Sequence, residues 1–197
     1  MPHGGAAVWF TGLSGAGKTT LCRAVEVWLR AAGYSVEVLD GDELRRTVNA
    51  DLGFTLEDRM ENVRRIGAMA ERLVKTDRIV LVAAITPYRA MREAVRRKIP
   101  AFMEVYVNAP LQTCIERDTK GFYRRALAGE IKQFTGVSDP YEEPLAPEVE
   151  CLTAEETVAT SVEKTVQALT RLLLRMMEAE HASSAVQRRG VASRVTM

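Results

Sequence analysis

The chain has 197 residues, which suits one ordinary domain. Hydrophobic residues make up 47% of the chain and charged residues 27%, so a sizeable core is available and disorder of the whole chain is excluded. The 27 Lys and Arg residues nearly balance the 26 Asp and Glu residues, which gives a formal charge of +1 and no general field for a nucleic acid or an anionic membrane. Any affinity for an anion has to come from local placement of cations.

No segment predicts insertion into a membrane or export. The longest unbroken apolar run, residues 79–85, is too short to span a bilayer. The apolar stretch at residues 6–10 leads directly into a glycine-rich loop, so we expect no signal peptide and a cytoplasmic protein. The three cysteines, Cys22, Cys114 and Cys151, match neither a disulfide framework nor a metal-ligand spacing. We expect each of them to be a small buried apolar residue.

Hydrophobic periodicity and turn residues predict strands and helices in alternation. We expect strands at residues 6–11, 35–39, 79–85, 102–107 and 149–152, and helices at residues 17–32, 57–75, 88–98 and 110–117. The capping-box sequence TAEE at residues 153–156 predicts the start of a last helix. This alternation is typical of an α/β fold, in which helices flank both faces of a parallel sheet. Ligands of such sheets bind beyond the carboxyl ends of the strands, so polar motifs should directly follow strands.

Two segments depart from this alternation. Residues 118–147 are rich in glycine, proline and charge, and they carry the basic and aromatic sequences KGFYRR and KQF. So long a connection is typical of a mobile lid that closes over phosphates, although a solvated loop is the structural alternative. The apolar pattern is lost after about residue 179. We therefore assign residues 1–178 to a single domain and expect residues 179–197 to form a disordered tail.

The strongest motif is GLSGAGKT at residues 12–19, which fits G-x-x-x-x-G-K-[ST] between a predicted strand and a predicted helix. The glycines allow the backbone to curl so that successive N–H groups point at phosphate oxygens, and the helix N-terminus adds partial positive charge. Lys18 is placed to reach the β- and γ-phosphates, and the Thr19 hydroxyl is placed at a Mg²⁺ site. The motif predicts binding of a nucleoside triphosphate and leaves the reaction open.

Acidic side chains follow the second predicted strand. Asp40 and Asp42 are placed to organise Mg²⁺ and its waters, or to accept a hydroxyl proton during phosphoryl transfer. Asp42 and Arg45 are three residues apart and would share a helix face. A purely structural role as a helix cap stays open for either acid.

Two further signals concern a second ligand. Arg59 and Asn62 can project together from one helix, arginine suits forked hydrogen bonding with phosphate or sulfate, and Phe54 offers a face on which a purine can stack. A solvated charged helix face is the alternative. Thr86 follows the third predicted strand, where it either contacts a phosphoryl group or merely ends the strand together with Pro87.

Together these motifs resemble the adenylylsulfate kinase (APS kinase) family. The resemblance runs from about residue 8 to residue 173 and rests on GLSGAGKTT, LDGDELR, DLGF, EDRMENVRRIG, ITPYR and ERDTKGFYRRALAGEIKQFTGV. The glycine loop, or P-loop, is common to many families, whereas the other motifs are much more restrictive. The resemblance implies a P-loop kinase fold and transfer of the γ-phosphoryl group of ATP to the 3′-hydroxyl of adenosine 5′-phosphosulfate (APS). The products are PAPS and ADP, and the reaction belongs to sulfate assimilation.

The resemblance also implies roles for individual residues. The donor ATP would be held by Gly12, Leu13, Ser14, Gly15, Ala16, Gly17, Lys18, Thr19, Thr20 and Arg117, with Mg²⁺ on Thr19. The acceptor APS would be held by Asp40, Asp42, Arg45, Phe54, Arg59, Asn62, Ile85, Thr86, Lys132 and Phe134, with the two phenyl rings on either face of its adenine. Lys18, Asp42 and Thr86 would be the catalytic residues. A homodimer is implied as well, and a functional association with ATP sulfurylase is left open.

One position departs from the family pattern. Thr86 stands where the family usually has Ser in an S-P-[YF] turn, and some members are described as phosphorylated there. In-line transfer needs no phosphoenzyme, so we expect Thr86 to contact the substrate rather than carry an obligatory phosphoryl group. Two other interpretations stay open. One is another small-molecule P-loop kinase, of the gluconate, shikimate or nucleoside-monophosphate type, and the other is a regulatory nucleotide switch or an inactive binding module.

Overall fold

The structure, a computed structural model, describes residues 4–192. Five parallel strands form one sheet in the order β2-β3-β1-β4-β5. The strands are β1 (Ala6–Thr11), β2 (Val36–Asp40), β3 (Ile79–Ala83), β4 (Phe102–Asn108) and β5 (Val149–Leu152). The helices are α1 (Lys18–Ala31), α2 (Gly41–Arg46), α3 (Leu56–Val74), α4 (Arg89–Arg96), α5 (Leu111–Arg117), α6 (Phe122–Leu127) and α7 (Val158–Ala192). The predicted α/β fold is confirmed.

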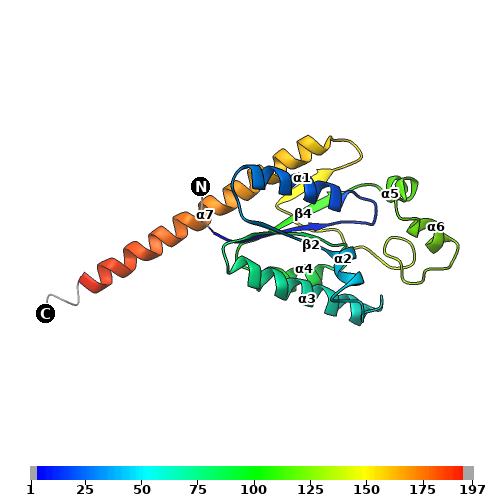
Figure 1. The fold of residues 1–197 in the computed structure, drawn as a ribbon, viewed down its shortest axis with the longest axis horizontal. Helices are drawn as coiled ribbons and strands as arrows, with labels where there is room; N and C mark the ends of the chain where they lie inside the picture. Colours follow the sequence, from blue (N-terminus) through cyan, green and yellow to red (C-terminus); the bar gives the residue numbers. More distant parts are fainter. Residues whose placement is uncertain (1–3, 193–197) are drawn as a thin grey trace.

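Helices cover both faces of the sheet (Figure 1). Helices α1 and α7 pack together on one face, and α3 and α4 pack together on the other. The short helix α6 lies beyond the sheet, at the end of the molecule opposite to the projecting part of α7. Among residues 4–192, no helix combines the length and the apolar character that a membrane crossing needs.

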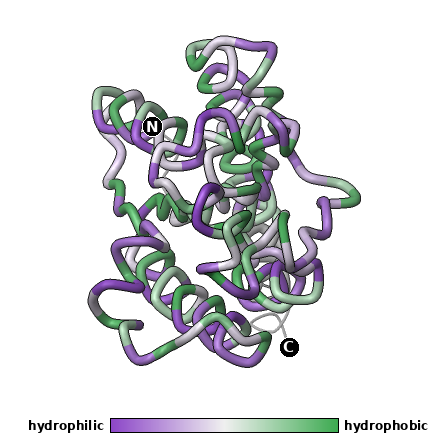
Figure 2. Tube along the Cα trace, turned by 90° about the vertical axis from the view of Figure 1, so that its right-hand side faces the viewer, coloured by the Kyte–Doolittle hydropathy of each residue, from purple (hydrophilic) through white to green (hydrophobic). Residues whose placement is uncertain are grey.

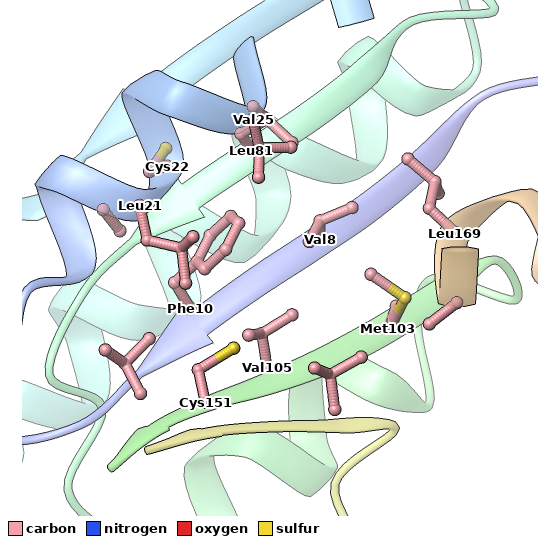
Figure 3. Packing of buried hydrophobic residues seen from close by; sticks show 14 of the residues in the cluster. Val8, Phe10, Leu21, Cys22, Val25, Leu81, Met103, Val105, Cys151 and Leu169 are labelled. Atoms are coloured by element: carbon pink, nitrogen blue, oxygen red, sulfur yellow. The ribbon is translucent and has the colours of Figure 1, made fainter. Parts of the chain in front are cut away.

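The period of two along the central strand explains why the sheet has two buried faces. Val8 and Phe10 of β1 enter one hydrophobic cluster, while Ala7 and Trp9 enter the other. Figure 3 shows Val8 and Phe10 among apolar side chains of α1, namely Leu21, Cys22 and Val25. Along the helices, hydrophobic and hydrophilic residues alternate, as expected for helices with one face on the sheet (Figure 2). All three cysteines are buried and free, as predicted.

Three predicted boundaries are wrong. Strand β3 ends at Ala83, two residues early, because the chain turns at Thr86, which has a φ of 46°. The last helix starts at Val158, because the hydroxyl of Thr157, not that of Thr153, accepts a hydrogen bond from the backbone N–H of the residue three positions on, at 3.2 Å. Helix α7 continues through residues 179–192, where a disordered tail was expected.

The continuation of α7 has a physical reason. Residues 179–192 contain four Ala, two Arg and no proline, so their backbone can continue the helix although their apolar pattern has ended. In Figure 1 this part of α7 projects away from the sheet, as expected for a helix without an apolar stripe to bury. The rest of the expected tail, residues 193–197, lies outside the described residues.

Candidate active site

A cavity of about 750 Å³ opens where β1, β2 and β3 end. Most of the residues predicted for the donor and acceptor sites line it, namely Ser14, Gly15, Gly17, Lys18, Thr19, Thr20, Asp42, Arg45, Phe54, Arg59, Asn62, Ile85, Thr86, Arg117 and Phe134. Five predicted residues do not line it, namely Gly12, Leu13, Ala16, Asp40 and Lys132. Three of these belong to the glycine loop itself, whereas the side chain of Lys132 is exposed and outside the cavity. The structure thus gathers motifs that are up to 120 residues apart in the sequence around one cavity.

The glycine loop between β1 and α1 has the curled backbone that its sequence predicts. Gly12 has a φ of 149°, and a Cβ atom there would lie 2.3 Å from the carbonyl oxygen of Val107 in the neighbouring strand. Gly17, directly before α1, has a φ of 103°. Residues with a side chain rarely adopt such angles, so these two glycines are required by the path of the loop.

Lys18 folds back over this loop. Its ammonium group donates hydrogen bonds to the carbonyl oxygens of Gly12 at 3.0 Å and Leu13 at 2.7 Å. Burial lowers the pKa of Lys18 from 10.5 to about 8, and the nearby Asp42 carboxylate only partly opposes this shift. An anion such as a phosphate would restore the charged form of this lysine.

The remaining carbonyl groups of the loop are held by side chains from distant parts of the chain. These bonds are Tyr123 Oη to Ser14 O at 3.0 Å, Arg117 Nη1 to Gly15 O at 3.3 Å and Thr153 Oγ1 to Ala16 O at 2.7 Å. Because the carbonyls are engaged, the loop offers N–H groups rather than carbonyls to a ligand, which suits an anion. Tyr123 and Thr153 were not predicted to have this role. Tyr123 was visible only as part of the lid sequence, and Thr153 was assigned to a helix cap.

The two predicted acidic residues have different partners. Asp40 joins the loop to α2, since its Oδ2 accepts a hydrogen bond from the Thr19 hydroxyl at 2.8 Å and its Oδ1 accepts one from the backbone N–H of Asp42 at 2.9 Å. Asp40 is therefore the N-cap of α2. The side chain of Asp42 instead forms an ion pair with Lys120 from the lid segment. Of the two acidic residues that could cap this helix, Asp40 is the one that does so.

Phe54, which lines the cavity, lies close to two arginines. The guanidinium carbon of Arg45 lies 4.6 Å from the centre of the Phe54 ring, and that of Arg59 lies 5.8 Å from it. Burial, together with repulsion from Arg59, lowers the pKa of Arg45. The ring itself is 53% exposed, so one apolar face with two cations beside it is open to a ligand.

Arg59 connects α3 to the lid segment. Its side chain is 8% exposed and donates to Phe54 O at 2.9 Å and to Thr135 Oγ1 at 2.9 Å. The same guanidinium bonds the carbonyl of Gln133 and pairs with Asp139 at 3.3 Å. Arg59 and Asn62 both line the cavity, and Asn62 accepts a hydrogen bond from Asn49 at 3.0 Å.

Phe134 and Thr86 form two further parts of the wall. The ring of Phe134 packs edge-on against Tyr123, with centroids 5.0 Å apart. Thr86 is 2% exposed, and its hydroxyl accepts a hydrogen bond from the indole N–H of Trp9 at 2.9 Å. The Thr86 hydroxyl is therefore engaged inside the protein.

A phosphate-binding loop at the carboxyl edge of a parallel sheet, with an acidic residue and a cationic aromatic pocket facing it, defines a P-loop kinase. A sequence model of the family described as "Adenylylsulphate kinase" matches residues 4–152. The chain belongs to this family.

Similar proteins agree with that assignment. An adenylyl-sulfate kinase from Picosynechococcus is 55% identical over 172 residues, which cover 87% of this chain and 97% of the relative. The solved structure of the Mycobacterium tuberculosis APS kinase in complex with AMPPNP and APS has a TM-score of 0.82 at 41% identity, covering 86% of this chain and 99% of that one. A gluconokinase from Sinorhizobium meliloti has a TM-score of 0.58 at 19% identity, covering 88% and 97%, which shows the fold alone.

Proposed function

We propose that this protein is an adenylyl-sulfate kinase that transfers the γ-phosphoryl group of ATP to the 3′-hydroxyl of APS and releases PAPS and ADP. Membership of the family and the name of the relative at 55% identity support this function. The observation that carries it is the single cavity that holds both the Lys18 loop and the Phe54 pocket with its two arginines. A sugar-acid acceptor would need neither an aromatic face nor two cations.

The donor half of the proposed site binds ATP through the glycine loop. Lys18 and the free N–H groups of the loop bind the β- and γ-phosphates, and Arg117 and Thr20 line the adjoining wall. The hydroxyl of Thr19 and the carboxylate of Asp40 lie 2.8 Å apart and are hard oxygen donors of the kind that Mg²⁺ prefers, so these two residues would hold the ion. When bound, Mg²⁺ neutralises phosphate charge.

The acceptor half binds APS through Arg45, Arg59 and the rings of Phe54 and Phe134. An APS of charge about −2 beside an ATP of charge about −4 costs several kcal/mol of Coulomb energy at an effective dielectric constant of about 20. Cations gathered at the cavity, among them Lys18 and Lys120, offset this repulsion. Lys120 first releases the carboxylate of Asp42, and Asp42 then accepts the proton of the 3′-hydroxyl of APS. The Asp40 carboxylate caps helix α2, which presents Asp42.

In this proposal Thr86 lines the acceptor site and does not carry a phosphoryl group. Its hydroxyl is buried and bonded to Trp9, which supports that role. We expect Thr86→Ala to lower turnover by about tenfold, since one hydrogen bond and one methyl contact are lost. Steady-state PAPS formation measures the effect. A loss of more than about 10³-fold with the fold intact would instead point to an obligatory phosphothreonine.

Residues 118–147 act as a lid in this proposal, held to the site by Lys120 and by the contacts of Arg59. Lys132 is exposed in this structure, so an acceptor contact by Lys132 requires the lid to move. We propose further that the protein works in the cytoplasm as a homodimer, a state that light scattering would test. Three buried free thiols fit a reducing compartment.

One assay tests the proposed function directly. The protein is incubated with Mg²⁺, ATP and APS, and PAPS is separated and quantified. We expect PAPS and ADP in equal amounts, and ADP release that depends on APS. AMP and gluconate serve as alternative acceptors, and Lys18→Ala serves as the matched inactive protein. ADP release that is indifferent to APS, or faster with gluconate, would contradict the proposal.

A further inference from the structure

Arg92 is a buried arginine of α4 that does not line the cavity. Its side chain is 3% exposed, yet each of its three nitrogens has a partner in a different part of the fold. Nε pairs with Glu104 of β4 at 2.7 Å, Nη1 donates to the carbonyl of Thr86 at 2.7 Å, and Nη2 donates to the carbonyl of Glu142 at 2.6 Å. A buried guanidinium with hydrogen bonds from both Nη atoms and an ion pair at Nε links those three segments.

The first of these segments is under backbone strain. Thr86 is a β-branched residue with a φ of 46°, a region that such residues rarely adopt, and it immediately precedes Pro87. Strain of this kind persists only where the surroundings hold the backbone. The bond from Arg92 to the Thr86 carbonyl is shorter than the bond that the same carbonyl accepts from Thr11, at 3.5 Å. Of the two side chains that donate to the Thr86 carbonyl, Arg92 thus makes the shorter hydrogen bond.

The second segment is the return of the lid segment to the sheet. Besides its bond to the Glu142 carbonyl, Arg92 lies 5.7 Å from the centre of the Tyr141 ring. The hydroxyl of Tyr141 bonds to that of Thr11 at 2.9 Å, and the Thr11 hydroxyl donates to the carbonyl of Ile85 at 2.7 Å. The end of the lid and the turn at residues 85–87 are therefore joined three times: directly by the N–H of Glu142 donating to the Pro87 carbonyl at 2.8 Å, through Arg92, and through Thr11.

We infer that Arg92 is a positioning residue for the acceptor site, which ties the strained turn at Thr86 to the carboxyl end of the lid. The inference rests on the proposed function, since Ile85, Thr86 and Pro87 are the part of the wall that would face APS. Arg92 itself touches neither substrate. It holds the turn in the strained form, and Glu104 compensates its buried charge.

Arg96 provides a matched control on the same helix. It also approaches Glu104, at 3.4 Å, and it pairs with Glu148 at 2.6 Å, but it has no bond to Thr86 or Glu142 among the described residues. Arg96→Lys therefore disturbs the same ionic cluster and leaves the turn supported. Arg92→Lys keeps the positive charge beside Glu104. It loses the two Nη atoms that donate to the carbonyls of Thr86 and Glu142 at the same time.

Trp9 reports on the turn without any reaction. Its indole N–H donates to the Thr86 hydroxyl at 2.9 Å, and the chain has only two tryptophans. In a Trp28→Phe background the fluorescence comes from Trp9 alone. Arg92→Lys and Arg96→Lys are compared in this background by Trp9 emission, by thermal midpoint, and by the KM values for APS and ATP.

We expect Arg92→Lys to shift Trp9 emission and to raise KM for APS by about tenfold, with KM for ATP changed by less than about twofold. Saturating APS should partly reverse the emission shift. Arg96→Lys should lower the thermal midpoint without either effect. An unchanged Trp9 emission, or an equal rise of both KM values, would overturn the inference.

Two further experiments cover the cases in which Arg92→Lys does not fold or the wild-type protein makes no PAPS. If Arg92→Lys fails to fold, the pair Arg92→Met with Glu104→Gln removes both carbonyl bonds without leaving a buried carboxylate unpaired, and the same outcomes apply. If the wild-type protein makes no PAPS, the proposed function fails, while the emission shift of the Arg92 variant still decides whether Arg92 holds the turn.

Discussion

The donor and acceptor halves of the cavity are built in different ways. On the donor side, a contiguous loop carries the binding groups, and Lys18, Tyr123, Arg117 and Thr153 fix its carbonyls before any ligand arrives. On the acceptor side, the pocket consists of side chains from several elements, and Arg59 is bonded to the lid. The binding groups of the donor side thus lie in one contiguous loop, whereas those of the acceptor side come from several elements. Substitutions on the two sides should separate the two substrates.

The largest effect is expected for Lys18→Ala. The variant loses the one ammonium group that the loop carries toward the phosphates, so transfer should fall by about 10³-fold or more. PAPS formation measures it, and binding of APS, followed by calorimetry, should persist because the acceptor half is untouched. An equal loss of APS binding would show that the two halves are not separable.

Arg59→Ala should mainly affect the acceptor, with KM for APS raised by about 100-fold and KM for ATP nearly unchanged. Steady-state kinetics with each substrate in turn checks this split. Asp139→Asn is the control, since it removes the ion pair at 3.3 Å but leaves the arginine in place. An unchanged apparent affinity for APS in Arg59→Ala would remove this residue from the pocket.

The depressed pKa of Lys18 predicts a pH dependence of the donor half alone. Burial lowers this pKa to about 8, so the charged amine is present below pH 8 and is lost as the pH rises through that value. Affinity for Mg-ATP should then fall by about fivefold between pH 8 and pH 9. Titration calorimetry measures the fall. Lys18→Arg binds more weakly but stays charged, so its affinity should not change across this range, and a parallel fall would assign the titration to another group.

The smallest effect is expected for Tyr123→Phe, which removes the hydrogen bond to the Ser14 carbonyl and keeps the ring packed on Phe134. One such bond corresponds to a rise of about fivefold in KM for ATP. Tyr34→Phe, at the opposite end of α1, is the matched control. A rise in KM for APS but not for ATP would place Tyr123 on the acceptor side instead.

The sequence predicted the glycine loop between β1 and α1 correctly because that loop is one contiguous segment. The strand before GLSGAGKT and the helix after it were enough to place Lys18 and Thr19. The α/β fold followed from the alternation of strands and helices. Spacing on one helix also placed Arg59 and Asn62 in the same cavity.

The parts that sequence analysis missed depend on tertiary contacts. Thr153 has the form of a helix cap, yet it supports the glycine loop. Arg92 lies in a helix rich in basic residues, as is typical of a solvated surface. Its side chain is nevertheless buried, where it forms an ion pair with Glu104 of β4. Lys132 follows the family motif but is exposed, because the path of the lid decides where its side chain lies. No periodicity or local pattern encodes these long-range partners.

The pairing of Arg59 with Asp139 has a consequence for selectivity. An incoming anion must compete with a carboxylate that already occupies this guanidinium, together with the Gln133 carbonyl and the Thr135 hydroxyl. A singly charged metabolite gains little from that exchange, whereas a mixed phosphate–sulfate anhydride brings more charge and several oxygens. If APS binds Arg59 as proposed, it displaces Asp139, Gln133 and Thr135 from this guanidinium, so binding of the acceptor is coupled to release of residues 133–139 from α3.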